Sequence, residues 1–248
     1  MIHRAAAEGF SRSAEAYDRG RPRYPKEAVA LVVSRLPPDA AVLDLAAGTG
    51  VLTRALLEAG VRVVAVEPVA EMRAALPGSV RALEGTAEAI PLGAGEVGGV
   101  VVGQAFHWFD GDAALAEIHR VLRPDGLLAL LWNGRVDEDP VNVAIEELVA
   151  PHRAGTPTHR GDAWRAAFER TSLFGPLEEH ELANSQELDA DGMEARVGSI
   201  SFIAALDAAE RAKVLERARA LAGEGTVTVP YRTEVQLCRR LGPSPDPS

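Results

Sequence analysis

The stretch VLDLAAGTG, residues 42–50, joins a short apolar run to a turn made of small residues. The run is typical of a strand that is buried on both faces, yet it contains the carboxylate of Asp44. Gly48 and Gly50 in the turn have no Cβ atom and can adopt positive φ angles. Such a turn lets the backbone approach a ligand closely, and the stretch therefore predicts a binding site.

The segments around this stretch alternate between strand and helix patterns. The residues after the turn form one apolar helical face that ends at Gly60, a typical C-cap. Strands that alternate with helices form βαβ units, so we expect an α/β fold with a doubly wound, mostly parallel sheet. Strands are predicted at 41–47, 61–68, 80–85, 98–106 and 127–133, and helices at 26–36, 51–60, 69–76 and around Leu115 and Ile118, up to the sequence PDG at 124–126.

The pattern changes after residue 133. Helices are predicted over 137–150 and 163–172, and again where residues 214–222 form an apolar stripe. Residues 177–189 alternate like a strand with one face in water, and 226–240 have a strand pattern around Pro230. Because proline donates no backbone hydrogen bond, Pro230 is expected at a bulge or an edge position. No linker is long enough to divide the chain, so we expect a single domain over residues 1–248.

Composition restricts the possible partners. The chain has 248 residues and a formal net charge of −10, so its surface would repel nucleic-acid phosphates and anionic membranes. Cys238 is the only cysteine, and His152 and His159 have no acidic or cysteine partner at ligand spacing, so we expect no metal site. The sequence shows neither a signal peptide nor a run of ~18 apolar residues, which predicts a soluble cytoplasmic protein.

Three classes of ligand fit a glycine-rich turn of this kind. A phosphate loop would need a Gly-Lys-Ser/Thr sequence, which the chain lacks. A dinucleotide fingerprint would match at Gly48 and Gly50 but has Thr53 in place of its third glycine. The third class is an adenosyl compound without phosphate. Asp44 would attract the sulfonium and ammonium of such a ligand and would repel a pyrophosphate, although a carboxylate that only caps the turn is the structural alternative.

Glu67 ends the second predicted strand, 17 residues after Gly50. An acidic side chain at this place can accept hydrogen bonds from both hydroxyls of a ribose. The alternative is an exposed glutamate at the end of a strand. The spacing from the glycine turn favours the ribose.

Four stretches, VLDLAAGTG, VVAVEPVAEM, GTAEAIPL and VVVGQAFHWFD, together resemble the class I S-adenosylmethionine-dependent methyltransferases. The last stretch resembles a branch of small-molecule enzymes with His-Trp-Phe after the fourth strand. The resemblance covers residues 10–135 and implies a Rossmann-like, seven-stranded sheet whose last strand is antiparallel and pairs with the sixth as a hairpin. It implies an N-terminal flap (1–26), a cofactor-binding half (27–133), a part that includes a helical substrate cover (134–223, mainly 134–176 and 190–222), the last strand (224–241) and a disordered tail (242–248).

The resemblance also implies a set of cofactor-binding residues. The turn after the first strand would surround the methionine part and the ribose, the end of the second strand would bind the ribose and the adenine face, and residues 86–88 would surround the adenine edge. Many relatives have aspartate at the position of Thr86, so Glu88 is a candidate to replace that contact. The predicted set is Tyr24, Asp44, Ala46, Gly48, Thr49, Gly50, Glu67, Pro68, Met72, Thr86, Ala87, Glu88 and Gln104.

Methyl transfer from a sulfonium depends mainly on alignment of the nucleophile and exclusion of water. His107 follows the fourth predicted strand, and we hypothesise that it positions or deprotonates the acceptor; the alternative is that it only shapes the pocket. Asn133, at the end of the fifth strand, has the strongest position among candidates for an acceptor pocket. The aromatic candidates are Trp132, Trp164, Phe168, Phe174 and Phe202, most of which core packing explains as well.

The predicted function is therefore methyl transfer from S-adenosylmethionine to a small-molecule acceptor, with no metal and no nucleic-acid or membrane partner. The sequence predicts no particular oligomeric state. Two alternatives stay open. One is an NAD(P)-dependent oxidoreductase on a similar sheet, which Asp44 and the missing third glycine disfavour. The other is a non-catalytic adenosyl-ligand-binding protein, which would carry the same cofactor motif.

Overall fold

The computed structural model describes residues 20–153 and 162–242. Most of the predicted flap (residues 1–19), His159 and residues 243–248 of the predicted tail lie outside the described residues. Within them, no helix is long and apolar enough to cross a membrane.

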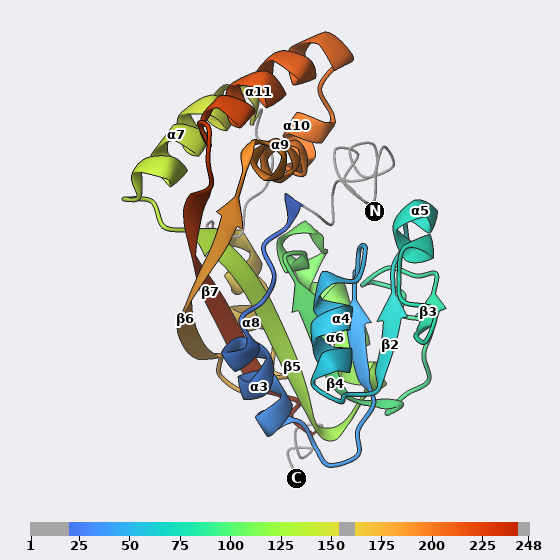
Figure 1. Cartoon of the computed structure of the whole chain (residues 1–248). Coiled ribbons are helices and arrows are strands. Elements are labelled where there is room, and N and C mark those ends of the chain that lie inside the picture. Colours follow the sequence, from blue (N-terminus) through green and yellow to red (C-terminus); the bar gives the residue numbers. More distant parts are fainter. Residues whose placement is uncertain (1–19, 154–161, 243–248) are drawn as a thin grey trace.

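A seven-stranded sheet with the order β3-β2-β1-β4-β5-β7-β6 forms the centre of the molecule (Figure 1). Its first five strands pair in parallel, and β7 is antiparallel to both of its neighbours. The Rossmann-like fold expected from the sequence is thereby confirmed. The strands are β1 (Val42–Leu45), β2 (Val63–Val66), β3 (Arg81–Leu83), β4 (Val97–Gly103), β5 (Leu122–Arg135), β6 (Glu178–Leu188) and β7 (Val227–Arg239).

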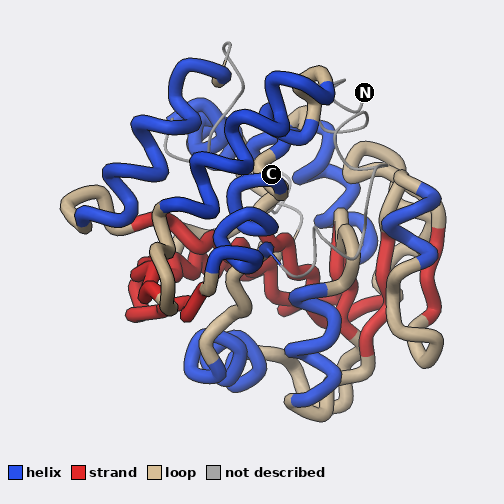
Figure 2. The backbone as a smooth tube through the Cα atoms, turned by 45° about the horizontal axis from the view of Figure 1, so that its top comes forward, coloured by secondary structure: helices blue, strands red, loops and turns tan. Residues whose placement is uncertain are grey.

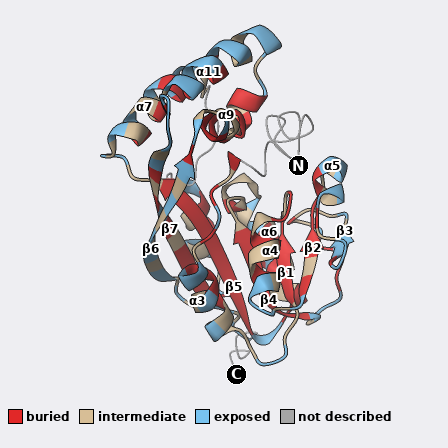
Figure 3. Cartoon of the chain, viewed as in Figure 1, coloured by how far each residue is buried: buried red, intermediate tan, exposed pale blue. Residues whose placement is uncertain are grey.

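Helices cover both faces of this sheet (Figure 2). On one face α3 (Lys26–Arg35) and α4 (Val51–Glu58) pack against strand residues such as Val42 and Val101. On the other face α6 (Gly111–Val121) and α8 (Arg165–Arg170) pack against the neighbouring residues, such as Leu43 and Val100. Because both faces are covered, the central strands are buried, and apart from Asp44 in β1 they are formed by apolar residues and glycines (Figure 3).

A second group of helices gathers above one end of the sheet (Figure 1). It consists of α7 (Pro140–Val149), α9 (Ala190–Gly198), α10 (Ser201–Ala204) and α11 (Ala208–Ala220), which form an apolar cluster with the ends of β6 and β7. Helices α9 to α11 lie between β6 and β7 in the sequence, so this strand pair is not a tight hairpin. The turn η3 (Asp162–Trp164) and α8, which the sequence analysis assigned to the cover, pack on the sheet instead, where Trp164 and Ala167 join its core.

The predicted end of the fourth strand is wrong. We expected the strand to continue to residue 106, but β4 ends at Gly103. The next residue, Gln104, has a φ angle of 60°, which no extended strand allows, and a 3-10 turn, η1 (Phe106–Trp108), follows. The short helix α5 (Ala70–Ala74) after β2 and the 3-10 turn η2 (Ala150–His152) after α7 complete the described elements.

The predicted start of the fifth strand is also wrong. The sequence PDG was expected only to end the preceding helix, but β5 already begins at Leu122 and includes it. Asp125 adopts a φ angle of 66°, and the pairing with β4 shifts register between Val97 and Gly99. This irregularity accommodates turn-forming residues inside a strand.

Pro230 lies where β7 extends past the end of β5. It opposes Ser185 of β6, whereas the pairing with β5 ends at the Arg135–Tyr231 pair. The carbonyl oxygen of Pro230 accepts a hydrogen bond of 2.8 Å from Asn142 Nδ2 of α7. Pro230 therefore lies at a local edge, one of the two positions expected for it.

Candidate functional site

A pocket opens beyond the carboxyl ends of β1 and β4, where the strand order reverses. It encloses about 500 Å³ of empty space, a volume that includes open solvent. Six of the predicted residues line it: Tyr24, Asp44, Ala46, Gly48, Thr49 and Gln104. Pro22, Val51, Leu52 and Gly103 line the pocket as well, although no binding role was expected for them from the sequence. A glycine directly after the run VVV was the available signal for Gly103.

The two glycines of the turn have different functions. At Gly48, where φ is 57°, only Met72 Sδ, at 4.0 Å, lies near the position that a Cβ atom would take, so the space beside Gly48 is open to a ligand. At Gly50, where φ is 88°, a Cβ atom would lie 2.8 Å from Leu76. Gly50 precedes the first residue of α4, and packing as well as its left-handed backbone requires glycine there.

Two residues other than glycine that line the pocket have left-handed backbones. Ala46 has a φ angle of 57° and Gln104 one of 60°. Such conformations cost free energy in residues with a Cβ atom and tend to occur at functional sites. They place the pocket-lining backbone after both β1 and β4 under strain.

Asp44 presents a buried carboxylate to this pocket. Thr53 Oγ1, on α4, donates a hydrogen bond of 2.5 Å to Asp44 Oδ2. Burial raises the pKa of Asp44 from 3.8 to about 7, against the effect of Thr53, and the nearby Glu67 contributes to the rise. A cationic ligand would favour the ionised form of Asp44, so the group is suited to respond to such a ligand.

Glu67 is buried behind the glycine turn. Its Oε2 accepts a hydrogen bond of 2.8 Å from Gly48 N, and its Oε1 accepts one of 2.9 Å from Val69 N. Burial raises the pKa of Glu67, although these two N–H groups and Arg73 act in the opposite direction. The side chain ties the turn to the end of β2. Each carboxylate oxygen keeps a second lone pair that could accept a hydrogen bond from a ribose hydroxyl. The ribose contact itself stays a prediction.

Among the described residues, those predicted to contact the adenine are absent from the lining of this pocket. They are Pro68, Met72, Thr86, Ala87 and Glu88. Met72 is buried beside Gly48, and the carbonyl oxygen of Pro68 accepts a hydrogen bond of 3.2 Å from Arg73. Ala87 belongs to the core cluster on the α6 face.

Thr86 and Glu88 make local contacts in the loop after β3. Thr86 forms an isolated bridge with Ala89, and Glu88 Oε1 accepts a hydrogen bond of 3.1 Å from Asp110 N, at the start of α6. Glu88, proposed from the sequence as a partner of the adenine amine, therefore fixes the loop to α6 in this structure.

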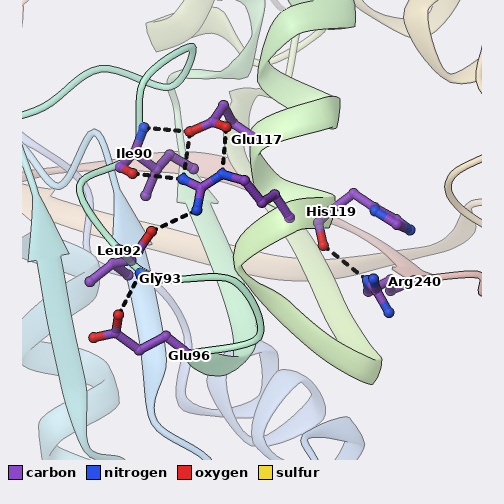
Figure 4. Close-up of polar contacts among 8 residues, drawn as sticks. Ile90, Leu92, Gly93, Glu96, Glu117, His119 and Arg240 are labelled. Atoms are coloured by element: carbon purple, nitrogen blue, oxygen red, sulfur yellow. Dashed lines mark hydrogen bonds and ion pairs between the residues drawn. The ribbon is translucent and has the colours of Figure 1, made fainter.

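The same loop is fixed to α6 farther along, as Figure 4 shows. Arg120 donates hydrogen bonds to the carbonyl oxygens of Leu92 (2.7 Å) and Ile90 (2.9 Å), and Glu117 Oε2 accepts one of 2.9 Å from Ile90 N. Arg120 and Glu117 also form an ion pair with each other at 2.7 Å. Residues 86–92 are thus held to α6 at several points, which keeps the predicted adenine edge of the site in place.

His107 lies in η1, beyond the end of β4, and is half-buried. Its ring centroid is 4.9 Å from that of Trp108. Among the described residues, the lining of the pocket includes Gln104 but not His107. If His107 acts on the acceptor, it therefore does so from outside this pocket, and its role stays a prediction.

The aromatic candidates for an acceptor pocket prove to be packing residues. The rings of Trp132, Trp164 and Phe168 form one cluster of ring contacts with Phe106. The ring centroids of Trp132 and Trp164 are 4.7 Å apart. Phe174 lies in the same core, and Phe202 packs against the cover helices.

Asn133, the polar candidate, is also engaged within the protein. Its Nδ2 donates a hydrogen bond of 3.2 Å to the carbonyl oxygen of Pro22. It therefore contacts the N-terminal segment in this structure, and nothing supports an acceptor contact. Among the residues that the structure describes, no three histidine, cysteine or acidic side chains are grouped so that they could hold a metal ion.

Comparison with known proteins identifies the family. A family model described as a methyltransferase domain matches residues 43–130, from β1 into β5. A protein of Mycobacterium tuberculosis named as an uncharacterized methyltransferase is 39% identical over 237 residues, which cover 90% of this chain and 92% of that protein. This chain belongs to the class I S-adenosylmethionine-dependent methyltransferases. An uncharacterized methyltransferase-like protein of Schizosaccharomyces pombe is 31% identical over 221 residues, or 86% of either chain.

The fold of this methyltransferase is similar to solved structures. A protein of Anaeromyxobacter dehalogenans, provisionally named a type II methyltransferase, matches with a TM-score of 0.63 and 26% identity, covering 88% of this chain and 96% of that chain. These findings confirm the enzyme class predicted from the sequence. The assignment to a His-Trp-Phe branch and the individual binding residues stay predictions.

Proposed function

We propose that this methyltransferase transfers a methyl group from S-adenosylmethionine to a small molecule, and that the pocket beyond β1 and β4 binds the cofactor. The observation that carries the proposal is the open space beside Gly48, in a pocket to which Asp44 contributes a buried carboxylate. This combination suits a compact cationic ligand that approaches the backbone, and it disfavours a pyrophosphate.

The charges of the lining support an amino-acid moiety in this pocket. The methionine part of the cofactor carries both an ammonium and a carboxylate. Asp44 offers a negative group and Arg21 a positive one, and both line the pocket. Opposite charges in the lining of one pocket would orient such a zwitterion.

When bound, the cofactor supplies a methyl group that is already activated for displacement, so the protein has to align the acceptor and exclude water. We assign these tasks to the N-terminal segment and the cover helices, on the side of the sheet where the strands end. His107 is proposed to accept a proton from the acceptor where the acceptor needs to lose one. Substitution of His107 by glutamine would then lower kcat by about 100-fold or more, with little change in cofactor affinity.

The acceptor is proposed to be a metabolite and not a nucleic acid, because the chain has a net charge of −10 and would repel a phosphate backbone. A cytoplasmic location is part of the same proposal, since the cofactor is itself a metabolite of the cell interior.

A screen for methyl acceptors tests this function. The purified protein is incubated with S-adenosylmethionine and pools of small oxygen, nitrogen and carbon nucleophiles, and the formation of S-adenosylhomocysteine is followed by mass spectrometry. We expect at least one pool to produce S-adenosylhomocysteine at a rate well above that without acceptor. Binding of the cofactor without turnover in any pool would instead favour the non-catalytic adenosyl-binding protein.

A further inference from the structure

A small polar cluster crosses the neighbouring strands β5, β7 and β6 near the carboxyl end of β5, on the side of the N-terminal segment. Its members are Asn133, Asn184 and Thr233, which we call the amide clamp. Asn133 Oδ1 accepts hydrogen bonds from Thr233 Oγ1 (2.6 Å) and from Asn184 Nδ2 (3.2 Å). Thr233 is fully buried and Asn133 nearly so. Buried polar groups of this kind are expensive unless paired, so the cluster needs an explanation beyond packing.

The amide clamp holds the backbone of the N-terminal segment, residues 20–24. Asn133 Nδ2 donates to the carbonyl oxygens of Pro22 (3.2 Å) and Arg23 (3.4 Å). Asn184 Nδ2 donates to the carbonyl oxygen of Arg23 at 2.8 Å. Side chains of β5 and β6 thus fix two consecutive carbonyl groups that are more than a hundred residues away in the sequence, and Thr233 of β7 acts on them through Asn133.

The segment held in this way forms one wall of the cofactor pocket. Arg21, Pro22 and Tyr24 line the pocket. The Tyr24 hydroxyl lies against the end of β4, where a Cβ atom on Gly103 would come within 2.6 Å of it. A displacement of the Pro22 and Arg23 carbonyls would therefore move the side chains that close the pocket.

The other end of the segment is attached to the cover. Arg21 donates a hydrogen bond of 2.9 Å to the carbonyl oxygen of Ser199, directly after α9. Gly20 packs so closely on α9 that a Cβ atom there would lie 2.1 Å from the carbonyl oxygen of Ala195. The amide clamp thus acts between the attachment to the cover and the beginning of α3.

Thr233 determines which way the Asn133 amide points. Because its hydroxyl donates to Asn133 Oδ1, the Nδ2 group of Asn133 faces the carbonyl oxygens of the segment. Without the hydroxyl, Asn133 Oδ1 would lose its shorter hydrogen bond in a buried place, and the amide orientation would be less well defined.

We propose that Thr233 is a positioning residue that, through Asn133 and Asn184, holds residues 20–24 as a wall of the pocket and so sets the affinity for the cofactor. This inference rests on the proposed function, since it takes the pocket to be the cofactor site.

Three threonine variants of the full chain test the proposal. Thr233→Val removes the hydroxyl at nearly constant shape, and Thr233→Ser restores it. Thr228→Val is the matched control, because Thr228 lies on the same strand and donates to Glu187 Oε1 at 2.5 Å in an exposed place far from the clamp. Titration calorimetry measures the Kd of S-adenosylhomocysteine, and urea unfolding confirms that each variant is folded.

We expect Thr233→Val to raise the Kd of S-adenosylhomocysteine by about 10-fold, the loss of one buried hydrogen bond, while Thr233→Ser and Thr228→Val stay within about twofold of the wild type. In limited trypsin digestion, Thr233→Val should also be cut faster after Arg23, which is exposed, and S-adenosylhomocysteine should slow this cut. A general loss of stability would speed cuts along the whole chain and not only the cut after Arg23. It would also leave the Kd of S-adenosylhomocysteine unchanged in the folded protein.

An unchanged Kd in folded Thr233→Val overturns the proposal. If that variant does not fold, Asn184→Ala on the outer strand β6 replaces it, with the same weakening expected and the same unchanged Kd overturning the proposal. If wild-type protein does not bind S-adenosylhomocysteine at all, the proposed function fails as well, and the two failures are thus distinguishable.

Discussion

Gly48 leaves an open space where any other residue would place a Cβ atom. Gly95 is a suitable comparison, because its φ angle of 65° is close to the 57° of Gly48 and no atom lies within 4 Å of its missing Cβ. We predict that Gly48→Ala and Gly95→Ala each lower the free energy of unfolding by about 1 kcal/mol, from the left-handed backbone alone. Only Gly48→Ala should weaken binding of S-adenosylhomocysteine, by about 10-fold or more, as measured by calorimetry. Equal Kd values for the two variants would mean that the ligand does not approach Gly48.

Asp44 gives a prediction for the pH dependence of stability. Burial raises its pKa from 3.8 to about 7 in the folded protein. Between these two values the folded protein holds a proton that the unfolded chain has lost, so the contribution of Asp44 to the free energy of unfolding falls as the pH rises and is constant above about pH 8. Asp44→Asn has no such dependence.

The difference in the free energy of unfolding, Asp44→Asn minus wild type, should therefore increase from about pH 5 to about pH 8, by about 2–3 kcal/mol at 1.36 kcal/mol per pKa unit, because the shift from 3.8 to about 7 leaves about two pKa units above pH 5. Urea unfolding at several pH values measures it, and other groups cancel in the difference. Parallel pH profiles for the two proteins would show that Asp44 is ionised throughout and that its burial does not control its charge.

At the scale of single residues, the sequence predicted which residues line the pocket better than it predicted their backbone conformations. Asp44 and Gly48 were identified from their place in a strand–turn–helix pattern, which is local. The left-handed backbones of Ala46 and Gln104 have no signal in the sequence, because alanine and glutamine favour other conformations. Asn133 was noticed at the end of a strand, but its partners at Pro22 and Thr233 are each about a hundred residues away, and only the fold brings them together.

The loop after β3 is the element whose attachment can be tested directly. Glu117 accepts a hydrogen bond from Ile90 N and forms an ion pair with Arg120, which in turn binds the loop carbonyls (Figure 4). Glu117→Gln should lower the free energy of unfolding by about 1–2 kcal/mol and speed hydrogen exchange at Ile90 N, because a charge-assisted pair is lost.

The matched control is Glu210→Gln, which breaks an exposed i,i+3 pair with Lys213 on α11. Exposed pairs of this kind contribute little, so its stability should stay within about 0.5 kcal/mol of the wild type. An effect of Glu117→Gln no larger than that of Glu210→Gln would contradict the role of Glu117 in holding the loop.

Elements with a regular pattern were predicted well, and irregular ones were not. The apolar runs of β1 and β2 and the alternation of β6 are direct consequences of which faces are covered, so the sequence contains them. The limits of β4 and β5 were wrong because tertiary pairing overrides local preference there: β5 includes PDG through a register shift, and Gln104 ends β4 in a strained conformation. The packing of α8 on the sheet, rather than in the cover, depends on Trp164 and its distant ring partners.

Over the whole molecule, the N-terminal segment connects the parallel half of the sheet, which contributes most of the pocket, with the cover, whose helices lie mainly between β6 and β7 in the sequence.

A ligand that binds only to the folded state raises the free energy of unfolding by mass action. S-adenosylhomocysteine at 100 times its Kd should therefore raise this free energy by about 2.7 kcal/mol, measurable as a higher Tm. No shift of Tm at that excess would contradict binding to the folded protein.

Direct titration of the purified wild-type protein tests the central claim, that the pocket beyond β1 and β4 is built for a cationic adenosine derivative without phosphate. Calorimetry should detect S-adenosylmethionine and S-adenosylhomocysteine with Kd values of about 1–100 μM, on the order of −8 to −5 kcal/mol, and no binding of NAD or NADP under the same conditions. Binding of a nicotinamide dinucleotide, with no heat from either adenosyl compound, would contradict the account.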